Sequence, residues 1–347
     1  MTILQNQQVC LRSRPAGLPT ASNWQFNSVP VRELMQGEIL VKVLLISVDP
    51  AMRGWMNEGR SYIRPVGIGE VMRAGGVGQI IASKSPKFSV GDIMSGTTGV
   101  QQYWIGAADD QTANFRRIDP TVASLPVWLN ALGMPGMTAY FGLLDIGKPR
   151  EGETVVVSGA AGAVGQAVGQ IAKKKGCRVV GIAGGPEKCQ FATDTLGFDA
   201  CIDYKAQSVY EGLRHHCPTG IDVYFDNVGG EILDAALACI NLNARIVICG
   251  AISQYNNTDA VKGPANYLAL LINRARMEGM IVFDYADRYP EAIAEISGWI
   301  KEGHFNTRED IVDGLEKFPE ALLMLFEGRN FGKMVLRVAG DTESDTV

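Results

Sequence analysis

Three glycines spaced by three residues form the part of the chain best suited to binding phosphate. Gly159, Gly162 and Gly165 follow the apolar run 154–158 and open the helix-like run 163–175. Without side chains, these positions let the backbone turn tightly and approach a pyrophosphate, which the N–H groups of a helix N-terminus then bind. The spacing is GxxGxxG rather than GxGxxG, but the strand before it and the helix after it provide the required context. The pattern predicts a dinucleotide site; glycine-rich packing without a ligand is the alternative.

The next strand ends without the carboxylate that NAD sites use. In those sites an Asp or Glu about 20 residues further on binds the ribose 2′-hydroxyl. Here the second strand ends at Gly184 and Gly185, and Glu187 falls within the first turn of the following helix. Lys188 can offer a positive charge to a 2′-phosphate, with an exposed helix lysine as the alternative. The sequence therefore favours NADP(H) as the cofactor.

Further loops follow other strands, and parallel strands place such loops at one edge of a sheet. The loop 226–230 follows one strand, 249–255 follows the next, and Gly279–Val282 is expected to be a sixth strand. Backbone and amide groups there could hold the ribose and the carboxamide, while the small Gly250 and Ala251 would let the nicotinamide lie close. The predicted cofactor contacts at the sixth strand are Met280, Ile281 and Val282.

Cysteines and histidines do not supply a metal site of the usual spacing. The seven cysteines contain no CxxC pair, and there are only three histidines. A zinc site of the usual kind needs three or four such ligands together. We expect reduced thiols that pack as small apolar side chains, a helix end carrying His215 and His216, and no bound metal.

Composition and charge limit the possible partners. The chain has 347 residues, of which 46% are apolar and 20% charged, with 32 basic and 37 acidic side chains and a formal net charge of −5. This balance disfavours broad attraction to nucleic acid. No apolar run approaches the roughly 18 residues that a membrane span needs, and the first residues do not resemble a secretory signal. We expect a cytoplasmic protein without nucleic-acid or membrane partners.

The elements that must position these loops alternate between strand and helix. After about Val127, strand-like runs are separated by helix-like runs, which predicts parallel strands joined by crossover helices in a doubly wound sheet. The strand-like runs are 154–158, 177–183, 200–203, 221–226 and 244–249, and the helix-like runs include 163–175, 186–196 and 230–240.

The first 125 or so residues have the pattern of strands and turns. A β-like run covers 38–48, shorter runs cover 77–81 and 91–94, and glycines are frequent between them. This pattern of strand-like runs and glycine turns predicts a compact, barrel-like β domain. Helix-like stretches at 287–302 and 318–326 precede a lone strand at 332–338 that could return to this domain, and the polar end 340–347 is expected to fray.

Several motifs together resemble one enzyme group. Besides the glycine turn they are 226–230, Cys249–Asn256, Glu327–Lys333, Met134–Tyr140 and Asp49–Gly54. The set spans nearly the whole chain. It resembles the zinc-independent branch of the medium-chain dehydrogenase/reductases, the group of prostaglandin reductases, plant double-bond reductases and bacterial curcumin reductases.

The resemblance implies an α/β protein with a chaperonin-10-like β-barrel domain, residues 1–127 with 307–347, and a Rossmann NADP-binding domain, residues 128–306. It implies a homodimer that reduces the C=C bond of α,β-unsaturated ketones and aldehydes, such as curcumin-like enones, with NADPH and without metal. Carried over by motif, the cofactor contacts are Gly162, Ala163, Val164, Gly165, Lys188, Tyr204, Asn227, Cys249, Gly250, Ala251, Ile252, Ser253, Tyr255 and Asn330.

One position departs from the pattern of this group. The usual motif is Asp-Pro-Tyr-Met-Arg-Gly, whose tyrosine helps to line the substrate cleft, and Ala51 replaces that tyrosine here. The loss enlarges or reshapes the pocket. Tyr62 is a candidate to fill part of the space, and a purely structural aromatic in the barrel is the alternative.

The implied reaction needs a hydrogen-bond donor, because hydride addition to the β-carbon leaves negative charge on the carbonyl oxygen. Without zinc, a tyrosine hydroxyl or the ribose 2′-hydroxyl must donate. Tyr255 is our candidate, since a phenol stays protonated near neutral pH; packing against the cofactor alone is the alternative. Tyr255 and Tyr62 are thus the predicted catalytic residues.

Two other functions stay open at this point. One is a quinone reductase of the same superfamily, which would turn over quinones and show little activity on enones. The other is a non-catalytic NADPH-binding redox sensor, which would bind the nucleotide without turnover.

Overall fold

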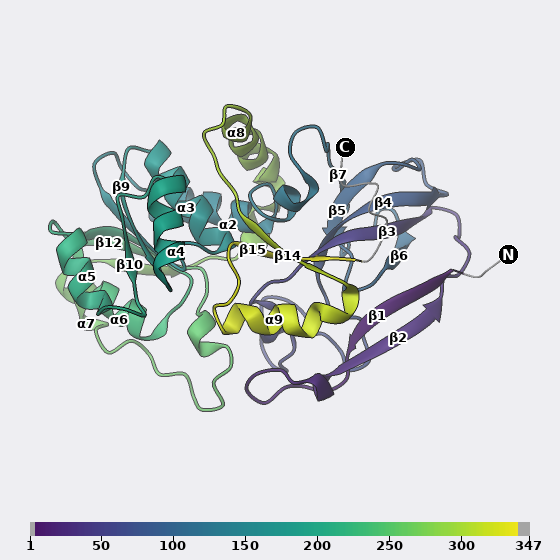
Figure 1. Ribbon diagram of the computed structural model, residues 1–347, viewed down its shortest axis with the longest axis horizontal. Coiled ribbons are helices and arrows are strands. Elements are labelled where there is room, and N and C mark those ends of the chain that lie inside the picture. The colour runs from purple at the N-terminus through teal and green to yellow at the C-terminus, as the bar shows by residue number, and fades with distance from the viewer. Residues whose placement is uncertain (1–3, 339–347) are drawn as a thin grey trace. The chain divides into compact units, whose positions relative to one another are not determined.

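The computed structural model describes residues 4–338, which form two compact units (Figure 1). The first contains the described residues up to Leu129 together with those from Glu309 onward, and the second contains Asn130–Arg308. The segment 340–347, expected to fray, lies outside the described residues.

The second unit is built on a six-stranded parallel sheet. Its strand order is β10-β9-β8-β11-β12-β13, and each neighbouring pair is parallel. Numbered along the chain from β8, the order is 3-2-1-4-5-6, that of doubly wound dinucleotide folds. The predicted doubly wound sheet is confirmed. The strands are Thr154–Ser158 (β8), Arg178–Ala183 (β9), Ala200–Asp203 (β10), Ile221–Asp226 (β11), Ile240–Ile248 (β12) and Arg276–Gly279 (β13).

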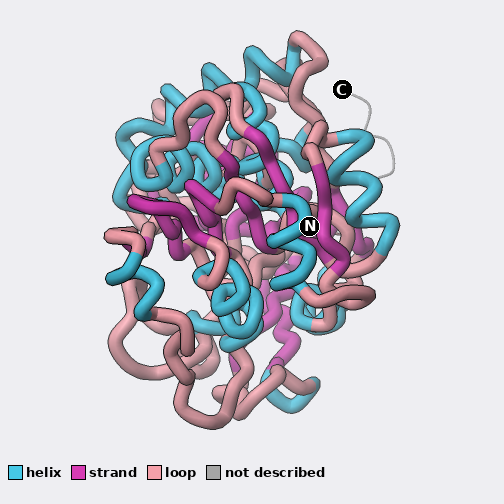
Figure 2. The backbone as a smooth tube through the Cα atoms, turned by 90° about the vertical axis from the view of Figure 1, so that its left-hand side faces the viewer, coloured by secondary structure: helices cyan, strands magenta, loops and turns pink. Residues whose placement is uncertain are grey.

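Helices cover both faces of this sheet. Figure 1 shows α2 and α3 on one side and α5 and α6 on the other, and Figure 2 shows helices flanking the strands from a second direction. Side chains of the central strands and of α5 and α6 share one buried core. Because β8 is covered on both faces, all five of its residues are buried, and its centre is the apolar run Val155–Val157. The helices are Met134–Phe141 (α2), Ala163–Lys174 (α3), Pro186–Gln190 (α4), Val209–His216 (α5), Gly230–Leu237 (α6), Leu268–Ile272 (α7) and Tyr289–Lys301 (α8).

Two predicted elements of this unit differ from the structure. The helix expected over 186–196 ends as an α-helix at Gln190 and continues as the π-helical turn Phe191–Thr195. The strand expected at Gly279–Val282 is wrong, because β13 ends at Gly279 and Val282–Arg288 forms a 3-10 helix. Met280 and Val282 are buried, so their apolar character reflects packing beside the sheet rather than pairing within it.

The first unit is rich in strands, as predicted. Its seven-stranded sheet has the order β14-β15-β3-β4-β5-β7, with β6 also paired with β3, while β1 and β2 form a separate two-stranded sheet. The elements are Gln5–Leu11 (β1), Trp24–Pro30 (β2), Glu38–Ser47 (β3), Met52–Trp55 (α1), Gly75–Ser83 (β4), Ile93–Thr97 (β5), Tyr103–Ala107 (β6), Arg116–Arg117 (β7), Glu309–Asp313 (β14), Phe318–Phe326 (α9) and Lys333–Arg337 (β15).

The C-terminal strand returns to the N-terminal sheet, because β15 pairs antiparallel with β3. It is not a lone strand, since β14 pairs with it in parallel. A buried ion pair strengthens this connection: Lys333 Nζ lies 2.9 Å from Asp49 Oδ1 and 2.8 Å from the Val48 carbonyl. Burial lowers the pKa of Lys333, and the Asp49 carboxylate opposes that effect. Removing one partner of such a buried pair typically costs about 3–5 kcal/mol, so this pair fixes the segment that carries Ala51.

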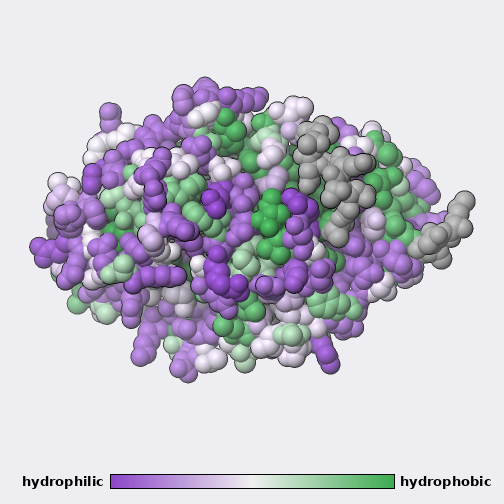
Figure 3. Space-filling model, viewed as in Figure 1, coloured by the Kyte–Doolittle hydropathy of each residue, from purple (hydrophilic) through white to green (hydrophobic). Residues whose placement is uncertain are grey.

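The surface view in Figure 3 is hydrophilic over most of the visible face, with separate apolar patches. Over residues 4–338, none of the helices has the length and apolar character that crossing a bilayer would require.

Candidate cofactor site

The predicted glycine turn joins the end of β8 to the start of α3. Gly159 has φ +63°, a left-handed conformation that favours glycine. Gly162 is the N-cap of α3 and offers no side chain to cap it. A Cβ at Gly165 would lie 2.2 Å from the Gly159 carbonyl oxygen, so only glycine lets the helix pack this closely on the turn. The N–H groups of a first helical turn lack intrahelical acceptors, and this geometry fits a pyrophosphate.

The turn lies where the order of the strands reverses. β8 pairs with β9 on one side and with β11 on the other, and the loops after β8 and β11 therefore meet at the same edge of the sheet. In doubly wound sheets this switch point is where ligands bind. The structure thus brings Gly162, Ala163, Val164 and Gly165 next to the loop that carries Asn227.

Hydrogen bonds join the two loops directly. Asn227 donates from its side-chain Nδ2 to the Ser158 carbonyl (2.7 Å) and from its backbone N–H to Ser158 Oγ (2.9 Å). Ser158 Oγ in turn donates to Asp226 Oδ1 at 2.9 Å. Ser158, at the end of β8, therefore holds the side-chain amide of Asn227 against the glycine turn.

The loop after β12 is hydrogen-bonded to the loop after β11. The N–H groups of Cys249 and Gly250 donate to the Asp226 carbonyl, and that of Ile252 donates to the Asn227 carbonyl. Tyr255 Oη accepts the Ala251 N–H at 3.2 Å. A Cβ at Gly250 would lie 2.8 Å from that Oη, so glycine makes room for the tyrosine. The predicted residues 249–255 thus form one hydrogen-bonded loop beside Asn227.

Cys249 is a neutral thiol in this loop. Burial, reinforced by the negative charge of Asp226, raises the pKa of Cys249 to about 12. The thiolate is the nucleophilic form of cysteine, so this side chain is suited to packing rather than to covalent chemistry.

The edge near β9 carries the residues predicted for the 2′-phosphate. Gly185 has φ +99° and precedes α4, which holds Lys188. A Cβ at Gly184 would lie 2.8 Å from Tyr204 Oη, so the Tyr204 ring covers the strand tip. A carboxylate does lie nearby, but it comes from β10: Asp203 Oδ1 accepts the N–H of Gly185 at 2.8 Å and that of Lys205 at 3.0 Å. The structure brings Lys188 and Tyr204 to the same strand tip.

Met280 stays at this edge although it is not in a strand. Its N–H donates to the Ile248 carbonyl at 3.1 Å, which places it beside the end of β12. Ile281 follows it, and the Val282 carbonyl accepts the Tyr289 hydroxyl at 3.1 Å.

Tyr62 and Asn330 belong to the first unit, unlike the other predicted site residues. Tyr62 is 52% exposed, and its Oη accepts the Trp55 indole N–H at 2.9 Å. Ala51 caps α1, the helix that carries Trp55. Asn330 donates to the Gly332 carbonyl at 2.9 Å.

Among residues 4–338, no three His, Cys, Asp or Glu side chains gather into a group that could hold a metal ion. His215 and His216 lie in the last turn of α5, as expected. All seven cysteines are free; Cys10, Cys177 and Cys217 are buried, as expected of thiols that pack as small apolar side chains, and the other four are partly exposed.

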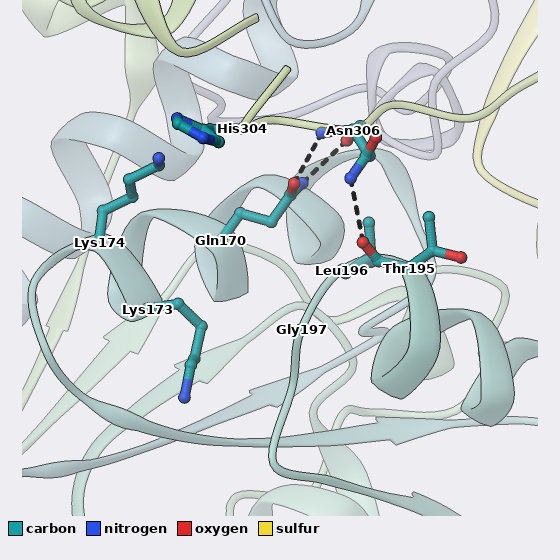
Figure 4. Close-up of a pocket in the computed structure, with 8 residues that line it drawn as sticks. All are labelled: Gln170, Lys173, Lys174, Thr195, Leu196, Gly197, His304 and Asn306. Atoms are coloured by element: carbon teal, nitrogen blue, oxygen red, sulfur yellow. Dashed lines mark hydrogen bonds between the residues drawn. The ribbon is translucent and has the colours of Figure 1, made fainter. Parts of the chain in front are cut away.

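A pocket of 310 Å³ elsewhere in the second unit contains none of the predicted site residues (Figure 4). The Gln170 side chain donates to the Asn306 carbonyl (2.8 Å) and accepts the Asn306 N–H (2.7 Å). Lys173 is paired with Asp199 at 2.9 Å. The two bonds of Gln170 hold Asn306 against α3, and we assign the pocket no ligand. It is lined by Gln170, Lys173, Lys174, Thr195, Leu196, Gly197, His304 and Asn306.

Sequence reasoning did not name Ser158, Tyr224 and Asp226 as site residues. Their side chains form a buried cluster beneath the loops. The signal available was an acidic residue and two hydroxyls within otherwise apolar strands, where a buried polar group requires partners.

Two family models match the chain. One, described as the N-terminal domain of oxidoreductase, matches residues 7–113, and the other, described as zinc-binding dehydrogenase, matches residues 163–298. Together with the strand order, they confirm the predicted two-domain fold class.

Close relatives cover almost the whole chain. The NADPH-dependent curcumin reductase of Escherichia coli is 45% identical over 343 residues, which is 97% of this chain and 98% of the relative. The NADP(+)-dependent 2-alkenal reductase of Nicotiana tabacum is 41% identical over 342 residues, with 97% and 98% covered. The crystal structure of CurA from Vibrio vulnificus in complex with NADPH has a TM-score of 0.90 at 47% identity and covers 96% of this chain and 100% of that one. The chain therefore belongs to the medium-chain dehydrogenase/reductase family and is an oxidoreductase.

Proposed function

We propose that this enzyme uses NADPH to reduce the C=C bond of α,β-unsaturated ketones and aldehydes, curcumin-like enones included. The observation that carries the proposal is the glycine turn at the switch point of the sheet, in a chain whose near full-length relatives are named NADPH-dependent curcumin reductase and 2-alkenal reductase. When bound, the dinucleotide supplies the hydride that ends on the β-carbon of the enone.

The residues proposed to hold NADP(H) come from the segments that follow the six strands of the second unit and from one segment of the first unit. The N–H groups at the start of α3 bind the pyrophosphate. The loops after β11 and β12 hold the ribose and the carboxamide, and Lys188 with Tyr204 binds the 2′-phosphate. In this proposal residues 128–306 are the NADP-binding domain and residues 1–127 with 307–347 the substrate domain. The proposed contacts are Gly162, Ala163, Val164, Gly165, Lys188, Tyr204, Asn227, Cys249, Gly250, Ala251, Ile252, Ser253, Tyr255, Met280, Ile281, Val282 and Asn330.

The chemistry proposed for the chain itself rests on Tyr255. As the alkene is reduced, negative charge collects on the carbonyl oxygen, and a hydroxyl donor stabilises it. In this proposal Tyr255, on the loop that follows β12, is that donor. Tyr62, beside Trp55, is proposed to contact the substrate in the space that Ala51 leaves. No metal takes part in this proposal.

A substrate panel tests the proposed function. NADPH oxidation is followed with enones, enals and quinones, and again with NADH. We expect turnover of enones and enals with NADPH. Quinone turnover with negligible enone activity would support a quinone reductase instead, and nucleotide binding without turnover of any substrate would support a redox sensor.

Lys188→Ala is expected to raise the Kd for NADPH roughly tenfold while leaving the Kd for NADH unchanged, because a charge-assisted contact to the 2′-phosphate is lost. Fluorescence titration of both nucleotides measures the effect. Lys174→Ala is the matched control. This lysine lies over the Trp299 ring at the C-terminal end of α3, away from the glycine turn. A loss of NADPH and NADH affinity in equal measure would contradict the proposed role.

A homodimer is proposed through the open edge of the six-stranded sheet. β13 is an edge strand, and unpaired edges favour pairing with another chain. Beside it in sequence, α7 exposes a contiguous apolar group: Tyr267 (59%), Leu268 (53%), Leu271 (74%) and Ile272 (67%). Exposed apolar patches of this kind mark interaction sites.

Leu271→Glu is expected to convert the dimer to a monomer, because it places a charge at the centre of this apolar group. Light scattering coupled to size-exclusion chromatography gives the mass. Val90→Glu serves as the control, since Val90 is an equally exposed apolar residue (66%) of the first unit. A monomeric wild type, or a variant that stays dimeric, would rule out this interface.

A cytoplasmic location is also proposed. The seven free cysteines are in the state expected of a reducing compartment, and the proposed small-molecule substrate requires no membrane or nucleic-acid partner.

A further inference from the structure

A single buried carboxylate receives four hydrogen bonds beneath the proposed cofactor loops. Asp226 Oδ1 accepts from Ser158 Oγ (2.9 Å), Tyr224 Oη (2.9 Å), and the N–H groups of Val228 and Gly229 (3.0 Å each). Ser158 and Tyr224 are fully buried, and Asp226 is 1% exposed. No group of this cluster is presented to a ligand from solvent, so its role must be exerted through the loops that it holds.

The bonds to Val228 and Gly229 fix the loop after β11. Gly229 has φ +72° and Gly230 has φ +58°, so the chain reverses sharply here. The N–H groups of Val228 and Gly229 therefore point back towards the Asp226 carboxylate at the end of β11. Ser158 fixes the same loop from β8, because its hydroxyl donates to Asp226 and accepts the Asn227 N–H. The cluster therefore locks the loop after β11 to the strand that carries the glycine turn.

The loop after β12 is hydrogen-bonded to the loop after β11. The Asp226 carbonyl accepts the N–H groups of Cys249 and Gly250, and the Val228 carbonyl accepts the Ser253 hydroxyl at 2.7 Å. Displacing the loop after β11 would therefore displace the loop that carries Tyr255 as well.

Tyr224 is suited to be a permanent donor in this cluster. Burial and the neighbouring carboxylate raise the pKa of Tyr224 well above its usual value, so the hydroxyl keeps its proton. Hydrogen bonds to an ionised acceptor in a dry environment are stronger than neutral ones.

We infer that Asp226, with Ser158 and Tyr224, is the positioning centre of the cofactor site: it fixes Asn227 and, through the loop after β12, Tyr255. This inference rests on the proposed function, because it assigns the cluster a role in NADPH binding and not only in stability. Asp226, Ser158 and Tyr224 are positioning residues that act through the loops above them.

The chain offers a matched control on the same strand. Asp222 lies at the opposite end of β11, where its carboxylate accepts the Thr154 N–H of β8 and the Asn241 side chain of β12, both at 2.8 Å. It joins the same strands by the same kind of bond, but at the edge away from the glycine turn. A purely structural role would make Asp222→Asn and Asp226→Asn behave alike.

The experiment compares Asp226→Asn, Tyr224→Phe and Asp222→Asn with the wild type. We expect the Kd for NADPH to rise about 10- to 100-fold in Asp226→Asn and about 3- to 10-fold in Tyr224→Phe, as for loss of charged and single hydrogen bonds, and to stay within about twofold in Asp222→Asn. Hydrogen exchange of the nucleotide-free proteins should show faster exchange at 227–229 and 249–255 in the first two variants only.

The outcomes separate the inference from the proposed function. If the wild type does not bind NADPH, the proposed function fails and the role in binding fails with it, whatever the exchange data show. If the wild type binds and the folded Asp226→Asn and Tyr224→Phe proteins bind equally well, the inference alone is overturned. Should Asp226→Asn not fold, Tyr224→Phe decides, because it removes one donor and keeps the aromatic ring.

Discussion

Gly165→Ala is expected to weaken NADPH binding about tenfold to a hundredfold, which corresponds to the roughly 1–3 kcal/mol typical of overpacking. A Cβ at this position would lie 2.2 Å from the Gly159 carbonyl oxygen and 2.8 Å from the Ala160 Cα. Both are backbone atoms, so no side chain can rotate away, and α3 must shift against the turn. The shifted N–H groups are the ones proposed to bind the pyrophosphate, so the strain reduces affinity directly.

Gly298→Ala is the control for this change. Gly298 lies inside α8, and a Cβ there would meet nothing within 4 Å, so the same substitution should leave NADPH binding unchanged. Fluorescence titration gives the two Kd values, and circular dichroism checks the fold. A folded Gly165→Ala protein with the affinity of the wild type would mean that the nucleotide does not bind at this turn.

The second unit was largely predictable from the sequence because its signals are local. A strand with a valine core, a glycine turn and an amphipathic helix follow one another over 154–175, and the structure has β8 and α3 there with almost the same bounds. Parallel strands with crossover helices then limit the possible topologies to few. The edge at which the strand-end loops meet follows from that topology.

The details that failed depend on contacts between distant residues. Nothing in the run 279–282 shows that its apolar side chains pack beside the sheet while β13 ends at Gly279. Asp203 approaches the tip of β9 from the neighbouring strand, so a search along β9 alone could not find a carboxylate there. The bond from Ser158 to Asp226 likewise joins residues 68 positions apart in the chain.

For the first unit, the sequence predicts the strand-rich fold class but not which strands pair. β14 has five residues, Glu309–Asp313, with acidic residues at both ends, and such a short polar segment gives little strand signal. Its partner β15 begins 20 residues after β14 ends, across α9. The bond between Trp55 and Tyr62 was equally invisible to local patterns, and it is what defines the surroundings of Tyr62 within this unit.

Tyr255→Phe is expected to lower kcat for enone reduction about 10²- to 10³-fold, the loss found when a hydrogen-bond donor to a developing oxyanion is removed. The Tyr255 oxygen accepts the Ala251 N–H at 3.2 Å, and a phenol hydroxyl is able to donate as well as to accept. The phenylalanine ring preserves the packing beside Gly250, while the substitution removes the proposed donor.

The loop itself should survive this change, because most of its hydrogen bonds do not involve the hydroxyl. The N–H groups of Ile252 and Ser253 donate to the carbonyls of Asn227 and Val228, and both bonds are kept in the variant. The Kd for NADPH should therefore stay within about threefold of the wild type, since these backbone bonds keep the loop in place. A large fall in kcat with a nearly constant Kd separates a donor from a residue that only packs against the cofactor.

Steady-state kinetics with an enone, together with a nucleotide titration, makes this measurement. Tyr210→Phe is the control, because Tyr210 is 42% exposed on α5 of the same unit, outside both the proposed cofactor site and the proposed dimer surface. If Tyr255→Phe turns over as fast as the wild type, the carbonyl oxygen must take its hydrogen bond from another group, and the ribose 2′-hydroxyl becomes the donor to test. If kcat falls and the Kd rises in parallel, Tyr255 acts by packing, and the loop after β12 serves binding rather than the reduction step.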